Sequence, residues 1–129
     1  MKPIFTYLMA VSLTVLSSFT QQSEIDQVIN ALQNGDATQL ANFFDDNVEL
    51  TLPEKSDNYG KAQALLILKD FFSNNAVKSF EVKHKGEQAG GQFCIGTLQT
   101  KAGNYRTTVF MKMKGKKQVV KEIRFQAIE

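Results

Sequence analysis

The chain has 129 residues, a formal net charge of +2 and 43% hydrophobic residues, which suits one globular domain and leaves too little sequence for two. Its only cysteine, Cys94, excludes an intramolecular disulfide and a cluster of thiolate metal ligands. Residues 21–77 hold three Lys and nine Asp or Glu, whereas residues 78–129 hold 11 Lys or Arg and four Glu. Two explanations fit this asymmetry: an anion-binding surface, or acidic helices packed beside a basic sheet.

The first 20 residues have the pattern of a secretory signal peptide. Lys2 gives a positive start, residues 4–16 form an uncharged apolar run, and small or hydroxylated residues follow. The run is shorter than the roughly 20 residues that a membrane-spanning helix needs. We therefore expect cleavage near Thr20, with Ser18 as the alternative, and export to the periplasm or the cell exterior. The mature domain, residues 21–129, is expected to have no membrane anchor.

Two helices are predicted at the start of this domain. Ser23 and Asp26 form a helix-start pattern, and apolar residues then recur at helical spacing, which predicts a helix over 24–34. Gly35 fits the end of that helix, and Asp36 is placed to cap a second one. The apolar face of the second helix is formed by Ala37, Leu40, Ala41 and Phe44.

The remaining chain alternates between strand and helix patterns. Residues 48–52 predict a short strand that Pro53 ends, residues 54–60 have the composition of a loop, and residues 60–73 predict a third helix. Four long strands follow, and their short glycine-bearing turns allow only antiparallel pairing. These strands are expected over 78–86, 92–100, 104–114 and 117–128.

Several segments carry a family resemblance, notably IDQVINALQNGDATQLANFFDDNVEL, YGKAQALLILKDFF and FEVKHKG. With the order of the elements, they resemble the nuclear transport factor 2-like (NTF2-like) proteins, and among these the secreted bacterial DUF4783 family of unknown function. The resemblance implies an α+β cone: three N-terminal helices packed on a curved antiparallel sheet of four long strands plus one short strand. It also implies a cavity at the wide end of the cone, but no particular activity.

His84, the only histidine, is the weak candidate for catalysis. It has the same strand parity as Phe80 and Val82, so we expect it to face the helices. There it can act as a general base if a carboxylate orients it, line a pocket, or be a structural residue with a local hydrogen bond. Tyr59 and Tyr105 are the other candidates for a ligand pocket, since tyrosine buries its ring and keeps its hydroxyl accessible.

The outer face of the sheet is the candidate for an interface. We expect it to combine several cations with Leu98, Phe110, Val120 and Ile128, which makes it less polar than contact with water requires. In many proteins of the resembled fold this face forms a dimer contact. We therefore expect a homodimer through these four residues.

The sequence has no motif for a nucleotide, a phosphate, calcium or a catalytic zinc, so we expect no cofactor and no metal site. Nucleic acid is not expected as a partner, because a recognition motif is missing and export is expected. The leading hypothesis is a non-catalytic module that binds a small apolar ligand or a protein partner. The alternatives are a small hydratase or isomerase that uses His84, and a purely structural dimerisation module.

Overall fold

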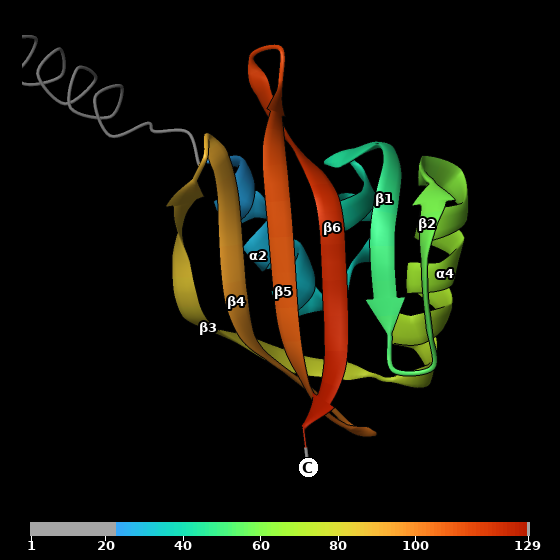
Figure 1. Ribbon diagram of the computed structural model, residues 1–129. Coiled ribbons are helices and arrows are strands. Elements are labelled where there is room, and N and C mark those ends of the chain that lie inside the picture. The colour runs from blue at the N-terminus through green and yellow to red at the C-terminus, as the bar shows by residue number, and fades with distance from the viewer. Residues whose placement is uncertain (1–22, 129) are drawn as a thin grey trace, which may run out of the picture.

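The computed structural model describes residues 23–128, which form three helices and one six-stranded sheet. The expected signal peptide, residues 1–20, lies outside this range. The strands lie in the order β2-β1-β6-β5-β4-β3, and the helices cover one face of the curved sheet (Figure 1). Along the chain the elements are α2 (Glu24–Asn34), α3 (Ala37–Ala41), β1 (Phe44–Leu52), β2 (Lys55–Gly60), α4 (Lys61–Asn74), β3 (Val77–Gln88), β4 (Gly91–Thr100), β5 (Gly103–Lys114) and β6 (Lys117–Ile128).

Local capping signals fix the ends of the first two helices, as the sequence predicted. The Ser23 hydroxyl accepts a hydrogen bond from the Asp26 backbone N–H at 3.4 Å at the start of α2. Gly35 ends α2 with a φ of 62°, a conformation that glycine adopts without strain. Asp36 then caps α3, because its carboxylate accepts the Gln39 N–H at 3.0 Å.

The sheet has six strands where the sequence predicted five. Residues 55–60 form the edge strand β2 and not a loop; nearly all their side chains are exposed, so they lack the apolar alternation of a buried strand. Strand β1 starts at Phe44, where the end of the second helix was expected. It also pairs in parallel with β6, so the sheet is mixed and not antiparallel throughout. The antiparallel run from β3 to β6 is confirmed.

A β-bulge at Lys83 reverses the alternation of β3. Between Val82 and His84 this strand advances by two residues while β4 advances by one. Side chains beyond the bulge therefore change face, and our expectation that His84 faces the helices is wrong: His84 is exposed on the outer face of the sheet. Lys85 takes the inner position, where its Nζ lies 2.8 Å from Asp26 Oδ1 on α2.

Two of the residues expected on the outer face belong to the core. Another bulge, at Lys121 on β6, turns Val120 inward, and its side chain is fully buried. Leu98 is also fully buried. It shares the inner face of β4 with Cys94, while apolar residues also occupy the other face of this strand, so alternation alone did not identify the buried side.

The core lies between the inner face of the sheet and the three helices. Its aromatic part is a cluster in which the Phe71 ring of α4 lies 4.8 Å from Phe125 and 5.3 Å from Tyr105, centroid to centroid. Phe72 packs edge-on against Phe125 from the same helix. These rings hold α4 over the end of the sheet where β1 turns into β2, and a pocket opens to solvent there.

Candidate functional site

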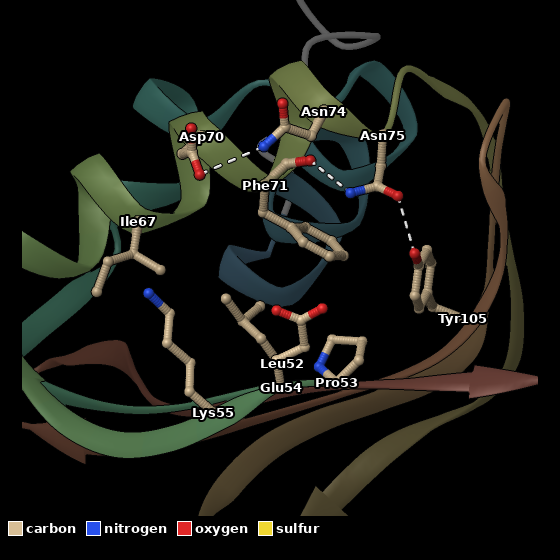
Figure 2. A pocket seen from close by; sticks show the side chains of 10 residues that line it. All are labelled: Leu52, Pro53, Glu54, Lys55, Ile67, Asp70, Phe71, Asn74, Asn75 and Tyr105. Carbon is tan, nitrogen blue, oxygen red and sulfur yellow. Dashed lines mark hydrogen bonds between the residues drawn. The ribbon is translucent and has the colours of Figure 1, made fainter.

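A pocket of about 370 Å³ lies between α4 and the turn that joins β1 to β2. Figure 2 shows this turn below the helix, with Tyr105 closing one side. We call it the mouth pocket. Ten residues line it: Leu52, Pro53, Glu54, Lys55, Ile67, Asp70, Phe71, Asn74, Asn75 and Tyr105.

The α4 side of the pocket follows from helical spacing. Ile67, Phe71 and Asn74 recur at intervals of three or four residues, so they lie on one face of the helix. Phe71 is buried and directs its ring into the space above the β1–β2 turn (Figure 2). Ile67 and Leu52, both half-buried, add aliphatic surface. Leu52, Ile67 and Phe71 form the apolar wall of a pocket whose lining is about equally polar and apolar.

A short hydrogen-bond chain fixes the aromatic wall. The Tyr105 hydroxyl donates to Asn75 Oδ1 at 2.8 Å, and Asn75 Nδ2 donates to the Phe71 carbonyl at 2.9 Å (Figure 2). Asn75 is itself buried, so these bonds satisfy a side chain that would otherwise be costly to bury. The wall is thus ordered before any ligand arrives.

Charged side chains surround the opening. Glu54 and Lys55 come from the β1–β2 turn and extend toward α4, and Asp70 comes from the helix above them (Figure 2). Asp70 accepts a hydrogen bond of 3.4 Å from Asn74 Nδ2. The pocket therefore combines an apolar wall with two carboxylates and one ammonium group at its rim.

Among the candidates from the sequence, the structure places Tyr105 in the mouth pocket and His84 away from it. Tyr59 lies on β2 opposite Val48, half-buried against the core, and does not line the pocket. The three residues therefore do not form one site.

Sequence reasoning missed most of the pocket. Glu54 and Lys55 were hidden in a segment that reads as a polar loop, and no spacing within it marks them. Asp70 and Asn74 did carry a signal, since they stand three and seven residues after Ile67, which is the spacing of one helix face. Only the fold shows that the turn and this helix face meet.

The outer face of the sheet holds the remaining apolar candidates. Phe110 is half-buried, with its ring centroid 6.5 Å from that of Phe93 and the Arg124 guanidinium 5.9 Å from its centroid. Ile128 lies at the end of β6 and is 45% exposed. With Leu98 and Val120 in the core, two of the four residues expected to form a dimer contact are on the outer face.

Cys94 is a core residue. Burial raises the pKa of its thiol to about 12, which keeps it protonated and unreactive at neutral pH. Residues 23–128 bring no three His, Cys, Asp or Glu side chains together as a metal site would need. In the same range, no helix has the length and apolar character to cross a membrane.

Comparison with known proteins identifies the family. A family model described as "Domain of unknown function (DUF4783)" matches residues 25–126. The chain belongs to the DUF4783 family.

Solved structures of the DUF4783 family have the same fold. The family protein from Bacteroides uniformis ATCC 8492 is 34% identical, with a TM-score of 0.78 over 81% of this chain and 96% of that chain. The one from Bacteroides ovatus ATCC 8483 is 33% identical, with a TM-score of 0.77 over 80% and 94%.

More distant structures show the fold alone. An NTF2-like protein of unknown function from Burkholderia xenovorans LB400 is 15% identical, with a TM-score of 0.62 over 81% of each chain. The predicted NTF2-like cone of the DUF4783 protein is therefore confirmed. No curated protein matches the sequence.

Proposed function

We propose that this DUF4783 protein binds a small molecule in the mouth pocket and performs no chemistry on it. The observation that carries the proposal is the lining of the pocket, in which an apolar wall of Leu52, Ile67 and Phe71 lies beside the fixed ring of Tyr105 and several polar side chains. Small-molecule sites are typically concave and apolar, with a few placed polar groups and volumes of roughly 300–1,000 Å³. At about 370 Å³ the mouth pocket suits a small ligand.

The positions of the titratable residues favour binding over acid–base catalysis. A general base must lie within hydrogen-bond reach of the proton that it removes. His84, the residue on which the hydratase alternative depends, lies on the opposite face of the sheet. The hydroxyl proton of Tyr105 is already engaged by Asn75. The mouth pocket therefore lacks the histidine on which the hydratase alternative depends, and its tyrosine hydroxyl already donates to Asn75.

We also place this binding outside the cytoplasm, because residues 1–20 have the pattern of a cleaved leader. Native mass spectrometry of the protein purified from its own cells tests both parts of the proposal. We expect a chain that begins near residue 21 and carries a small additional mass. A full-length chain would contradict export.

A blocking variant connects the additional mass with the pocket. Ile67→Trp adds a large side chain to the lining and is expected to abolish the additional mass. Leu66→Trp is the matched control, because the neighbouring Leu66 is 65% exposed and does not line the pocket. Far-UV circular dichroism checks that both variants fold. Retention of the mass by Ile67→Trp, or its loss from both folded variants, would contradict binding at this site.

A further inference from the structure

We infer, on the basis of the proposed function, that the ligand of the mouth pocket is a free amino acid with a large apolar side chain, bound as a zwitterion. The inference rests on the charges at the rim. Glu54, Lys55 and Asp70 bring both signs of charge to one small opening. A ligand that carries both an ammonium and a carboxylate can satisfy both signs at once.

The two charges from the β1–β2 turn are free to meet a ligand. Glu54 and Lys55 are exposed, extend toward α4, and form no ion pair with any residue of the range 23–128 (Figure 2). Lys85 and Lys114, in contrast, are both held by aspartates. Glu54 and Lys55 therefore keep their hydrogen-bonding capacity for a bound molecule.

The third charge favours an ammonium group on the ligand. Asp70 has accepted one hydrogen bond from Asn74, and a carboxylate has about four lone-pair sites, so it can accept more. Two carboxylates against one ammonium attract a cationic group, while Lys55 attracts an anionic one. A ligand with only a negative charge would be repelled by Glu54 and Asp70, and a ligand with only a positive charge would be repelled by Lys55.

The apolar wall of the pocket favours a ligand with an apolar side chain. Ile67 and the Phe71 ring face the β1–β2 turn directly above the charged groups, and the Tyr105 ring closes the far side (Figure 2). An aromatic or branched aliphatic side chain would contact these surfaces while its α-ammonium and α-carboxylate stay at the rim. The small volume of about 370 Å³ favours one free amino acid over a longer peptide.

A set of four ligands of nearly equal shape tests the inference. L-phenylalanine carries both charges, phenethylamine only the ammonium, 3-phenylpropanoate only the carboxylate, and 2-phenylethanol none. Dissociation constants are measured by NMR titration, following the amides of residues around the pocket. We expect L-phenylalanine to bind most tightly, and the loss of either charge to weaken binding by about tenfold.

Charge variants assign each contact. Lys55→Gln should weaken L-phenylalanine and 3-phenylpropanoate but not phenethylamine, whereas Glu54→Gln should weaken L-phenylalanine and phenethylamine but not 3-phenylpropanoate. Lys69→Gln is the control, because this exposed lysine of α4 lies outside the mouth pocket. All three changes are at exposed positions, so folding should be preserved.

The outcomes separate this inference from the proposed function. If 2-phenylethanol binds the pocket as tightly as L-phenylalanine, the zwitterion inference is overturned while small-molecule binding stands. If none of the four binds and the additional mass blocked by Ile67→Trp is not an amino acid, the inference again fails alone. If none binds and no such mass exists, both fail.

Discussion

Ala89 has a φ of 53°, the only positive value for a residue other than glycine within residues 23–128. It forms a two-residue turn with Gly90, whose φ is 81°, between the paired residues Gln88 and Gly91. Positive φ at both positions is the geometry of a type I′ turn, in which Asn-Gly is the favoured sequence. The alanine Cβ makes this conformation unfavourable by about 1–2 kcal/mol.

Ala89→Asn is expected to stabilise the protein. Asparagine tolerates the left-handed conformation, so we expect the free energy of unfolding in urea to rise by about 0.5–1 kcal/mol. Ala102→Asn is the control, because Ala102 lies in the next hairpin turn and does not have a positive φ. An equal gain from both substitutions would show that turn geometry is not the cause.

Among the elements, β3 carries one extra residue, Lys83, between two segments that pair regularly with β4. On both sides of the bulge at Lys83 the side chains lie on the faces that suit their polarity. Phe80 lies on the inner face, His84 on the outer face, and Lys85 on the inner face beside α2. Without the extra residue, the strict alternation of a strand would give the same assignment. The bulge therefore accommodates Lys83 so that the residues on both sides of it keep these faces.

Deletion of Lys83 should consequently be tolerated. We expect the free energy of unfolding to fall by less than about 1 kcal/mol, since every apolar side chain of β3 keeps its face. Deletion of Glu81 is the matched comparison: regular pairing would then turn Val82 outward and Lys83 inward, at a cost of at least about 2 kcal/mol. Urea unfolding of the two deletions measures the difference, and equal costs would refute this account of the bulge.

The elements also show how far sequence reasoning reaches. Helix caps at Ser23 and Asp36 and the four long strands were predictable, because these signals lie within a few adjacent residues. Strand β2 was not, since an exposed edge strand is held by its backbone bonds to β1 and needs no apolar pattern. The bulges at Lys83 and Lys121 were hidden for a related reason: their pairing partners lie on other strands.

The residues of the mouth pocket also differ in whether a local sequence pattern marks them. Tyr105 was predictable because its strand parity and amphipathic ring mark it as a wall residue. Glu54 and Lys55 could not be predicted as pocket residues, because they line the pocket only where the β1–β2 turn lies beside α4. No local sequence pattern indicates that these two segments lie together. His84 was misplaced by a single extra residue in its strand.

At the scale of the whole molecule, the opposite charges of the two halves of the chain pair with each other at the protein surface. Lys85 pairs with Asp26 at 2.8 Å. Lys112 and Lys114 both pair with Asp45, at 2.7 and 2.8 Å. Each pair joins the acidic first half to the basic second half. Asp26 lies on helix α2, as expected for acidic helices beside a basic sheet, whereas Asp45 lies on strand β1.

Asp45 is the centre of the larger of these clusters, and its titration links the cluster to stability. Hydrogen bonds from Lys112 and Lys114 hold the pKa of its carboxyl well below the ordinary value of 3.8. A carboxyl with a lowered pKa stabilises the fold fully above its ordinary pKa. As the pH falls below 3.8, Asp45 becomes protonated in the unfolded chain but stays ionised in the folded chain. The stabilisation is therefore progressively lost.

Asp45→Asn should therefore lower the free energy of unfolding by about 1 kcal/mol at pH 7, with a smaller effect at pH 3. Urea unfolding at the two pH values measures both quantities. Asp46→Asn is the control, because its side chain is 86% exposed and pairs only with Lys114, whereas that of Asp45 is 12% exposed. We expect little change from Asp46→Asn at either pH. If Asp45→Asn lowers the free energy of unfolding equally at pH 7 and pH 3, the charge of Asp45 does not stabilise the contact between the two halves of the chain. The substitution would then act only through packing.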